Sequence, residues 1–504
     1  MSFVELPVEL IEMICVRCSL DEIKTLRLTC QSLRNVADDY LFPEIVTVMT
    51  RDSMEAARQI AQHPKFCRQP RLLCFQGDTS EPLQFEEWKS KLQSQIEVDA
   101  HITKADRKHL QELGEISMRR DRDREIDPDL EAREKALIQL IRANADAQPK
   151  PSYSEAQLQD HYGHYSELAY EGMQIIEDET IQRCMQAVFE KCSNIRAFDF
   201  TTANALRVHT HKENKQFRRG LITPFGDYER CAEGLEAMQE IVLAADEAGY
   251  SPQTLRLGSV TFHVARHPDL SRAMSRFMAK VENLHWIVST PYLEDDDLGV
   301  DSEEFAEIML GFQEGYCTNL MSSAGNLRSL ELDMPCPNPG EDKIELSDVV
   351  GTLSWPNLRN VAITTIYANS TDLVDFLLRH AATLERLELN EVTLNGEWPE
   401  CFSKFAGKLP RLKEVQLRGV FDINSGFFCF FGDLYTSRGN EYSQRVARYI
   451  IEGGEEFPMP PDNNREEAMI PDSESDDHEE SDSDDEDFLF AEEDDDLLGI
   501  DVQH

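Results

Sequence analysis

The chain has 504 residues, a formal net charge of −45 and 41% hydrophobic residues. This length exceeds the size at which one hydrophobic core keeps growing, so we expect two or more structural units. The negative charge excludes nucleic-acid binding, because phosphate binding needs a basic surface. Part of the negative charge is concentrated in the last forty residues. From Arg465 to the end, nineteen Asp or Glu residues stand against one Arg, which accounts for 18 of the 45 charges.

The first forty residues predict three short helices. Pro7 suits the first turn of a helix, where its missing N–H is not needed. Leu10, Ile14 and Cys18 recur at the spacing of one helix face, and Ser19 with Glu22 has the spacing of a capping box for a second helix. Three short helices leave apolar surface that another surface must cover. The apolar residues of the second and third helices are Ile23, Leu26, Leu28, Cys30, Leu33, Val36, Ala37, Leu41 and Phe42.

This segment resembles an F-box, the adaptor motif of Skp–cullin–F-box ubiquitin ligases. The resemblance rests on Leu6-Pro7, the Leu10/Ile11/Ile14 run, Ile23, Leu26-Arg27-Leu28, Cys30, Leu33-Arg34 and Leu41-Phe42, under a tenth of the chain. One position departs from the pattern, since many members carry a Trp where Leu33 stands. The alternative is an ordinary three-helix start to a globular domain. The resemblance implies an adaptor-binding surface made by Leu6, Pro7, Leu10, Ile11, Ile14, Ile23, Leu26, Leu28, Leu33, Leu41 and Phe42.

Strand and helix patterns follow the three helices of residues 1–43. Within residues 44–95 we expect strands at Glu44–Met49 and Pro70–Phe75 and a helix at Ser53–Gln62. The stretch Ile96–Pro151 is rich in charges of both signs and has no strand pattern. We expect it to be a charged, helical and partly disordered insertion.

Residues 152–457 repeat a strand pattern of the form L-x-x-L-x-L. Clear copies begin at Leu327, Leu358, Leu384 and Leu412, at spacings of 31, 26 and 28 residues. This period predicts a degenerate leucine-rich-repeat-like solenoid, and an irregular α/β domain is the alternative. Weaker copies begin at Ile195, Leu255 and Leu284. Helical stretches are expected at Asp342–Leu353, Thr371–Ala382 and Trp398–Ala406, with a capping helix at Tyr442–Glu452.

The predicted fold class is therefore α/β: an N-terminal three-helix F-box, then an irregular leucine-rich-repeat-like α/β solenoid, then an acidic tail. The tail, residues 458–504, is too poor in apolar residues to offset chain entropy, so we expect it to be disordered.

The repeat pattern also predicts a surface for a protein target. In each strand the leucines turn into the core and the residues between them face the other way. Side chains of mixed charge at such positions favour a specific contact over capture of any basic surface. The alternative is a merely solvated side of a sheet. The candidate target-binding residues are Glu331, Asn360, Arg386, Glu388, Gln416 and Arg418.

No recognised catalytic or cofactor motif is present: there is no phosphate-binding glycine loop and no G-x-S-x-G. The pair Cys15 and Cys18 is expected to pack in a helix rather than bind metal. The pairs His161/His164 and His209/His211 are expected to be surface or packing residues. We expect no cofactor and no metal. With no signal peptide, membrane span or disulfide framework, the chain is expected in the cytoplasm, the nucleus or both.

The resemblance implies a function without catalysis: recognition of a protein target for ubiquitination. The expected partners are a Skp-type adaptor, through it the cullin and RING subunits, and an unknown protein target. The alternative is an interaction scaffold outside ubiquitination, whose acidic tail captures basic partners such as histones.

Overall fold

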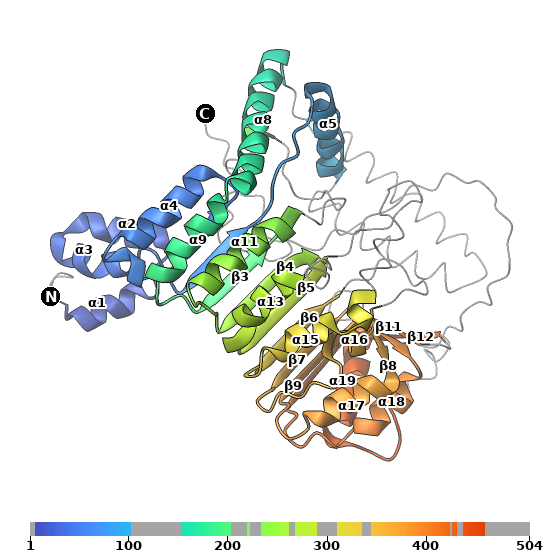
Figure 1. Cartoon of the computed structure of the whole chain (residues 1–504). Helices are drawn as coiled ribbons and strands as arrows, with labels where there is room; N and C mark the ends of the chain where they lie inside the picture. Colours follow the sequence, from blue (N-terminus) through green and yellow to red (C-terminus); the bar gives the residue numbers. More distant parts are fainter. Residues whose placement is uncertain are drawn as a thin grey trace.

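The computed structural model describes residues 6–101, 153–202, 219–221, 233–261, 268–289, 310–334, 344–423, 426–430 and 437–458. These residues form an α/β structure in which N-terminal helices precede a parallel sheet that alternates with helices (Figure 1). Most of the expected insertion and nearly all of the expected acidic tail lie outside the described residues, as do His209 and His211.

The three expected N-terminal helices are confirmed. The capping box forms as predicted, because the Ser19 N–H donates to Glu22 Oε2 at 2.7 Å and the Glu22 N–H donates to Ser19 Oγ at 3.4 Å. The first helix is shorter than expected. It ends at Cys15, because the chain must leave the helix before Ser19 becomes the extended cap of the next, so Cys18 lies in the turn. The elements of this N-terminal helical unit (residues 6–42) are α1 (Val8–Cys15), α2 (Leu20–Thr29), α3 (Gln31–Ala37) and the 3₁₀ helix η2 (Asp38–Tyr40).

Among the described residues the sheet has nine parallel strands, and their order in space is their order in the chain. A tenth strand, β12 (Gly426–Phe430), is antiparallel to the last of them. Two short strands, β8 (Tyr367–Asn369) and β10 (Thr393–Asn395), pair separately. The nine parallel strands are β1 (Glu44–Val48), β2 (Leu72–Gln76), β3 (Ala197–Thr201), β4 (Thr254–Thr261), β5 (Asn283–Ser289), β6 (Ser329–Asp333), β7 (Asn360–Thr364), β9 (Arg386–Asn390) and β11 (Glu414–Ile423).

Helices connect successive strands and form a layer on one face of the sheet, each in contact with the next (Figure 1). The helices expected at Ser53–Gln62, Thr371–Ala382, Trp398–Ala406 and Tyr442–Glu452 are confirmed. Of residues 344–353, only Leu346–Val350 form a helix, which ends before Gly351 because φ +45 at that residue breaks the helical path. The helices of this layer are α4 (Arg51–Gln62), α9 (Thr180–Lys191), α11 (Glu233–Glu247), α13 (Pro268–Phe277), α15 (Tyr316–Ser322), α16 (Leu346–Val350), α17 (Ser370–Arg379), α18 (Trp398–Phe405) and α19 (Ser437–Glu452).

The core lies between the sheet and this helix layer. Strand leucines such as Leu330, Leu332 and Leu389 are fully buried there, and they pack with helix residues such as Leu373 and Phe402. The residues between the leucines are half-buried or exposed in β6, β7 and β9. The predicted alternation of the repeat strands is therefore confirmed.

The register of the sheet corrects the start of two weaker repeat copies. Leu255 and Leu284 align with Leu330, which is the second leucine of its repeat and not the first. These copies therefore begin three residues earlier, at Pro252 and Val281, both of which are buried. A proline and a valine fill the first leucine position, so the leucine pattern alone assigned the wrong start.

Three of the four clear repeats also share a backbone feature, directly after the last residue that pairs with the neighbouring repeat. Thr365 and Glu391 directly follow β7 and β9 and have φ of 45° and 49°, which is uncommon for residues other than glycine. Gly419 occupies the same position after Arg418, with φ +78. The Thr365 N–H donates to the Asn390 carbonyl at 3.0 Å, and the Glu391 N–H donates to the Arg418 carbonyl at 3.1 Å. Each unit thus binds the next at this turn.

A smaller apolar cluster joins α5 (Phe85–His101) to α8 (Glu155–Glu177). Trp88 is fully buried, and its indole N–H donates to the Gly220 carbonyl at 3.2 Å. The Tyr165 hydroxyl donates to the Glu81 carbonyl at 2.7 Å. These contacts tie the segment between β2 and β3 together, and join it to Gly220 after β3, outside the main core.

Candidate interaction surfaces

The N-terminal helical unit has its own filled core. Ile11 and Cys15, four residues apart on α1, are buried in it. Cys18 packs against this core, and burial raises the pKa of the Cys15 thiol. The other buried residues of the core are Ile23, Leu33, Ala37 and Leu41.

Outside this core the unit exposes large apolar side chains. Leu10, Met13 and Val16 recur every three residues, on the side of α1 away from Ile11 and Cys15. Nine large apolar side chains are exposed among the described residues, and five of them lie within residues 8–28. We call these five the exposed apolar set: Val8 (53% exposed), Leu10 (44%), Met13 (58%), Val16 (69%) and Leu28 (87%).

The eleven residues predicted to bind an adaptor fall into three groups. Pro7, Leu10 and Leu28 are exposed, whereas Leu6, Ile14, Leu26 and Phe42 are half-buried. The sequence interpretation did not include Val8, Met13 and Val16 of the exposed apolar set, although the apolar spacing on the second side of α1 could have revealed them. The remaining four, Ile11, Ile23, Leu33 and Leu41, are buried in the core of the unit.

The predicted target-binding residues lie on the second face of the sheet, opposite the helix layer. The parallel register places Glu331, Ala362, Glu388 and Gln416 side by side on neighbouring strands. Asn360 and Arg386 are paired in a second row, and Arg418 pairs with Asn390 in a third. The six predicted residues therefore share one surface.

Several charges on this surface already contact one another. Arg386 lies 3.4 Å from Glu388 and 3.7 Å from Glu414, and Arg418 lies 3.7 Å from Glu388. The side chain of Glu388 is only 22% exposed. A partner must therefore match a paired, mixed-charge surface rather than a field of one sign.

The same row continues into earlier strands that the sequence interpretation left out. Asp199, Arg256, His285 and Glu331 occupy equivalent positions on β3, β4, β5 and β6. Arg256 Nη1 lies 3.1 Å from the buried Asp199 Oδ2, and His285 Nδ1 lies 3.5 Å from Glu331 Oε2. The three additional residues belong to the weaker repeat copies, so a corrected alignment of those copies would have found them.

The ionisation of this row follows from burial and from Arg256. The pKa of His285 is lowered to about 4. Burial is the larger cause, and the positive charge of Arg256 is the smaller one. Since His285 is then neutral near pH 7, its contact with Glu331 is not a full ion pair. Partial loss of solvent raises the pKa of Glu331, and the negative charge of Glu388 adds to this shift.

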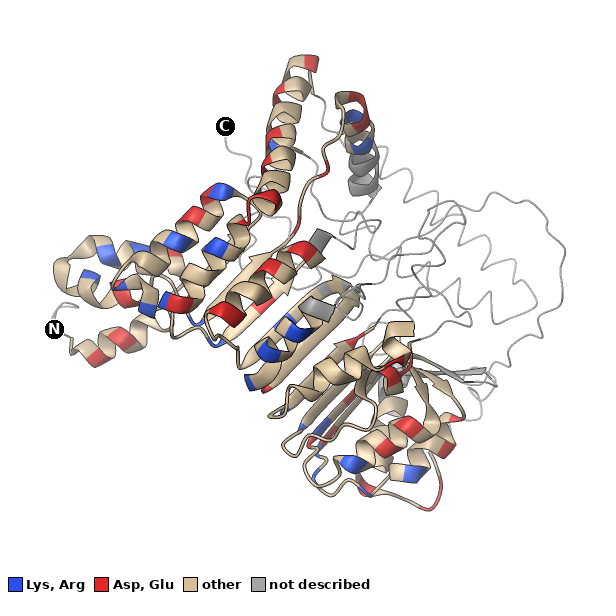
Figure 2. Cartoon of the chain, in the orientation of Figure 1, with Lys and Arg blue, Asp and Glu red and all other residues tan. Residues whose placement is uncertain are grey.

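Charge is also unevenly distributed over the helix layer. Figure 2 shows acidic residues along α11, which carries no basic residue, and arginines on the adjacent α13. Arg276 Nε lies 3.1 Å from Asp246 Oδ1 and joins the two helices.

Other features that could indicate a chemical site are few. Within the described residues, no group of three or more His, Cys, Asp or Glu side chains could hold a metal ion. His161 Nδ1 lies 2.8 Å from the Arg219 carbonyl, and His164 lies about 4 Å from Asp160 and Glu167 on its own helix. None of the helices that the structure describes is long and apolar enough to cross a membrane.

Comparison with known proteins returned no match, either to a protein-family model or to a curated protein. The sequence pattern and the two surfaces described above are therefore the features from which a function can be inferred.

Proposed function

We propose that this chain is the substrate-recognition subunit of a Skp–cullin–F-box ubiquitin ligase, with the N-terminal helical unit as its F-box. The observation that carries the proposal is the exposed apolar set on a unit whose own core is already filled. Leu10, Met13 and Val16 of this set lie on one side of α1, and apolar side chains that share a surface in this way are typical of a contact with another protein. The F-box resemblance of the same segment supports a Skp-type adaptor as that protein.

The parallel sheet and its helices would serve as a leucine-rich-repeat-like solenoid that holds the target. Its second face offers a row of mostly polar and charged side chains running from Asp199 to Gln416 across consecutive strands. In this role the chain forms and breaks no covalent bond. It raises the effective concentration of target lysines near the ubiquitin-conjugating enzyme, which the cullin and its RING partner would hold.

Such a complex would work in the cytoplasm or the nucleus. The alternative, a scaffold that captures basic partners with its acidic tail, depends on residues 465–504. These lie outside the described residues, so no described contact favours that alternative.

The test is co-purification of the chain with a Skp-type adaptor and a cullin. The variant Leu10→Asp with Met13→Asp places two charges in the exposed apolar set and leaves the buried core of the unit intact. We expect it to lose both partners, because interface anchors often contribute about 2 kcal/mol or more each. A matched control is Tyr170→Asp with Met173→Asp, which charges two exposed apolar residues of α8.

The control variant should retain the adaptor and the cullin at the wild-type level. Equal adaptor recovery by the Leu10/Met13 variant would refute the assignment of these residues. If the wild-type chain recovers neither partner, the F-box assignment itself is wrong and the scaffold alternative gains support.

A further inference from the structure

The segments that lead from a helix of the layer into the next strand meet at one edge of the sheet, because the strands are parallel. We call this edge the strand-start edge. Between α4 and β11 it is made by residues 63–71, 192–196, 248–253, 278–282, 323–328, 351–359, 380–385 and 406–413, all of which the structure describes.

The strand-start edge is basic although the chain is acidic. Its eight segments contain ten Lys or Arg residues and two Glu residues, a net charge of +8 in a chain whose net charge is −45. All ten basic residues are exposed, whereas Glu282 and Glu385 are half-buried. An exposed surface of one charge sign attracts a ligand of the opposite sign. The ten residues are Lys65, Arg68, Arg71, Arg196, Lys280, Arg328, Arg359, Lys408, Arg411 and Lys413.

The positive charge is densest at the last segments of the edge, where several cations share one carboxylate. Lys413 Nζ lies 2.7 Å from Glu385 Oε2, and Arg359 Nη1 lies 3.7 Å from Glu385 Oε1. The hydrogen bond and charge of Lys413 lower the pKa of Glu385 most, and the charges of Arg359 and Arg411 add to this shift. One carboxylate cannot offset three cations, so this part of the edge keeps a positive surplus.

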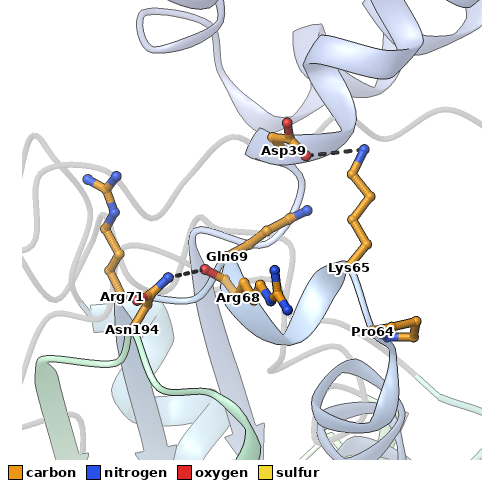
Figure 3. A pocket seen from close by; sticks show the side chains of 7 residues that line it. All are labelled: Asp39, Pro64, Lys65, Arg68, Gln69, Arg71 and Asn194. Atoms are coloured by element: carbon orange, nitrogen blue, oxygen red, sulfur yellow. Dashed lines mark hydrogen bonds and ion pairs between the residues drawn. The ribbon is translucent and has the colours of Figure 1, made fainter.

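At the other end of the edge, the basic side chains are spread apart. Lys65, Arg68 and Arg71 are among the residues that line a pocket of about 540 Å³, together with Asp39 and Asn194 (Figure 3). Lys65 Nζ lies 3.1 Å from Asp39 Oδ1, whereas Figure 3 shows Arg68 and Arg71 directed to different sides. This distribution suits an extended acidic segment better than a single compact anion.

The chain itself contains such a segment, and it begins near this edge. Residues 465–504 carry nineteen Asp or Glu residues and one Arg, a net charge of −18. The Gly407 N–H donates to the Ile450 carbonyl at 2.9 Å, and a Cβ at Gly407 would lie 3.1 Å from Gly453 Cα. Since Gly407 belongs to the last segment of the strand-start edge, the chain leaves α19 directly beside it.

The length of the acidic segment is sufficient to follow the whole edge. The eight strands from β2 to β11 span about 34 Å at a spacing of about 4.8 Å, whereas forty extended residues reach up to about 130 Å. A segment of the same chain is also present at a high effective concentration. An acidic protein in solution would have to compete with it, and a long nucleic acid would be repelled by the net charge of the chain.

We propose that residues 465–504 bind along the strand-start edge of their own chain. The contact rests on exposed charge pairs, each of which contributes little to the stability of the fold. The proposal goes beyond the function given above and does not depend on adaptor binding by the exposed apolar set.

The test is carbodiimide cross-linking of the full chain, which joins a carboxylate to a lysine only where the two are in contact. Mass spectrometry then identifies the lysines that are joined to residues 465–504. We expect the yield at the edge lysines Lys280, Lys408 and Lys413 to exceed that at Lys24 and Lys89, which are exposed elsewhere, by at least about fivefold. At about 1 M salt, where the Debye length is about 3 Å, the yield at the edge lysines should fall to that of the other two.

A variant of the edge separates attraction by charge from mere proximity. Arg328→Gln, Arg359→Gln and Arg411→Gln together remove three positive charges and leave the edge lysines in place as reporters. We expect this variant to lose most of the cross-links at Lys408 and Lys413. A matched control removes three exposed arginines of the helix layer, as Arg58→Gln, Arg183→Gln and Arg272→Gln, and should cross-link like the wild type.

Both variants should keep the wild-type melting temperature, which separates loss of the contact from loss of the fold. Equal yields at the edge lysines and at Lys24 and Lys89 would overturn the proposal, and so would equal losses in the two variants. Cross-linking an equal mixture of ¹⁵N-labelled and unlabelled chains tests whether the contact lies within one chain. Cross-linked pairs that combine the two labels as often as chance allows would mean that the acidic segment binds another copy, which would also overturn the proposal.

Discussion

On the second face of the sheet, single residues act through their neighbours in register. Glu388 contacts arginines on its own strand and on the next, and Arg256 contacts Asp199 on one side while lowering the pKa of His285 on the other. Neighbouring strands lie about 4.8 Å apart, so side chains in register cannot avoid one another. The charge of each residue therefore depends on strands that are distant in sequence.

The lowered pKa of His285 predicts a specific pH dependence of stability. Its pKa is about 4 in the folded protein and 6.5 in an unperturbed histidine. Between about pH 4 and pH 6.5, His285 therefore binds a proton in the unfolded chain but not in the folded chain. The stability associated with neutral His285 is therefore complete above pH 6.5 and is lost as the pH falls toward 4.

We expect the variant His285→Gln to lose less stability than the wild type between pH 6.5 and pH 5, by roughly 1–2 kcal/mol. Urea denaturation at a series of pH values measures the difference between the two proteins, and titrations common to both cancel in it. If the free energy of unfolding depended on pH in the same way in both proteins, His285 would not be kept neutral by its surroundings.

Gly419 is a described residue at which both the backbone and a neighbouring side chain restrict substitution. It has φ +78, and a methyl group there would meet the side chain of Glu391 from the preceding repeat. We expect Gly419→Ala to destabilise the sheet by about 1–2 kcal/mol. Gly325→Ala is the control, because an added Cβ there meets nothing and its φ is not positive. Thermal unfolding of both variants tests the prediction, which fails if the two variants have the same melting temperature.

Among the elements, α1 is unusual because it is apolar on two sides. One side closes the core of the N-terminal helical unit and the other remains exposed, so one eight-residue helix can both fold the unit and contact a partner. The repeat strands divide their roles in a similar way: leucines face the helix layer, and charged residues occupy the second face.

The element most open to a test of target binding is β9. Exchanging its two charges, as Arg386→Glu with Glu388→Arg, keeps the net charge but brings like charges together at Glu414 and at Arg418. We expect target recruitment to be lost while adaptor recovery is unchanged. Stability should change by no more than about 1 kcal/mol, because partly exposed ion pairs contribute little.

Paired co-precipitation from cells after proteasome inhibition measures target and adaptor recovery together. The same exchange in another charged pair, Arg276→Asp with Asp246→Arg between α13 and α11, is a matched control on the helix layer. An unaltered set of targets in the β9 variant would place target binding elsewhere.

At the scale of the whole molecule, the main core extends without interruption from β1 to α19. Its buried residues run from Ile45 to Ile450, and the chain adds each strand beside the previous one. An arrangement of this kind is extended by nearest-neighbour packing, so the terminal units have one open side. Here α19 packs against α18 and β11 and covers the open side of the last unit.

Residues 465–504 follow this core and contribute 18 of the 45 net negative charges. We expect deletion of residues 465–504 to leave the melting temperature within about 4 °C of wild type, since so acidic a segment gains little by packing on a negative core. Differential scanning calorimetry of the two chains checks this. A larger decrease would mean that the segment packs on the rest of the protein.

Local patterns in the sequence were sufficient for the alternation of strands and helices. Leu327, Leu358, Leu384 and Leu412 each begin a repeat whose strand formed where expected, because the strand alternation depends on neighbouring residues only. The same holds for the capping box of Ser19, whose two hydrogen bonds span three residues.

Only the tertiary structure decided which further residues join the surface that the repeat pattern predicted. The row of Asp199, Arg256 and His285, the left-handed turns at Thr365 and Glu391, and the pocket of Arg68 and Asn194 all depend on pairing between segments far apart in the chain. A one-residue change of register would turn every side chain of a strand to the other face, and no local pattern specifies that register where proline or valine replaces leucine. The sequence by itself therefore determined most of the elements, their order and the exposed side of the clear repeat strands, whereas parallel pairing and packing decided how far that surface extends and which distant segments meet.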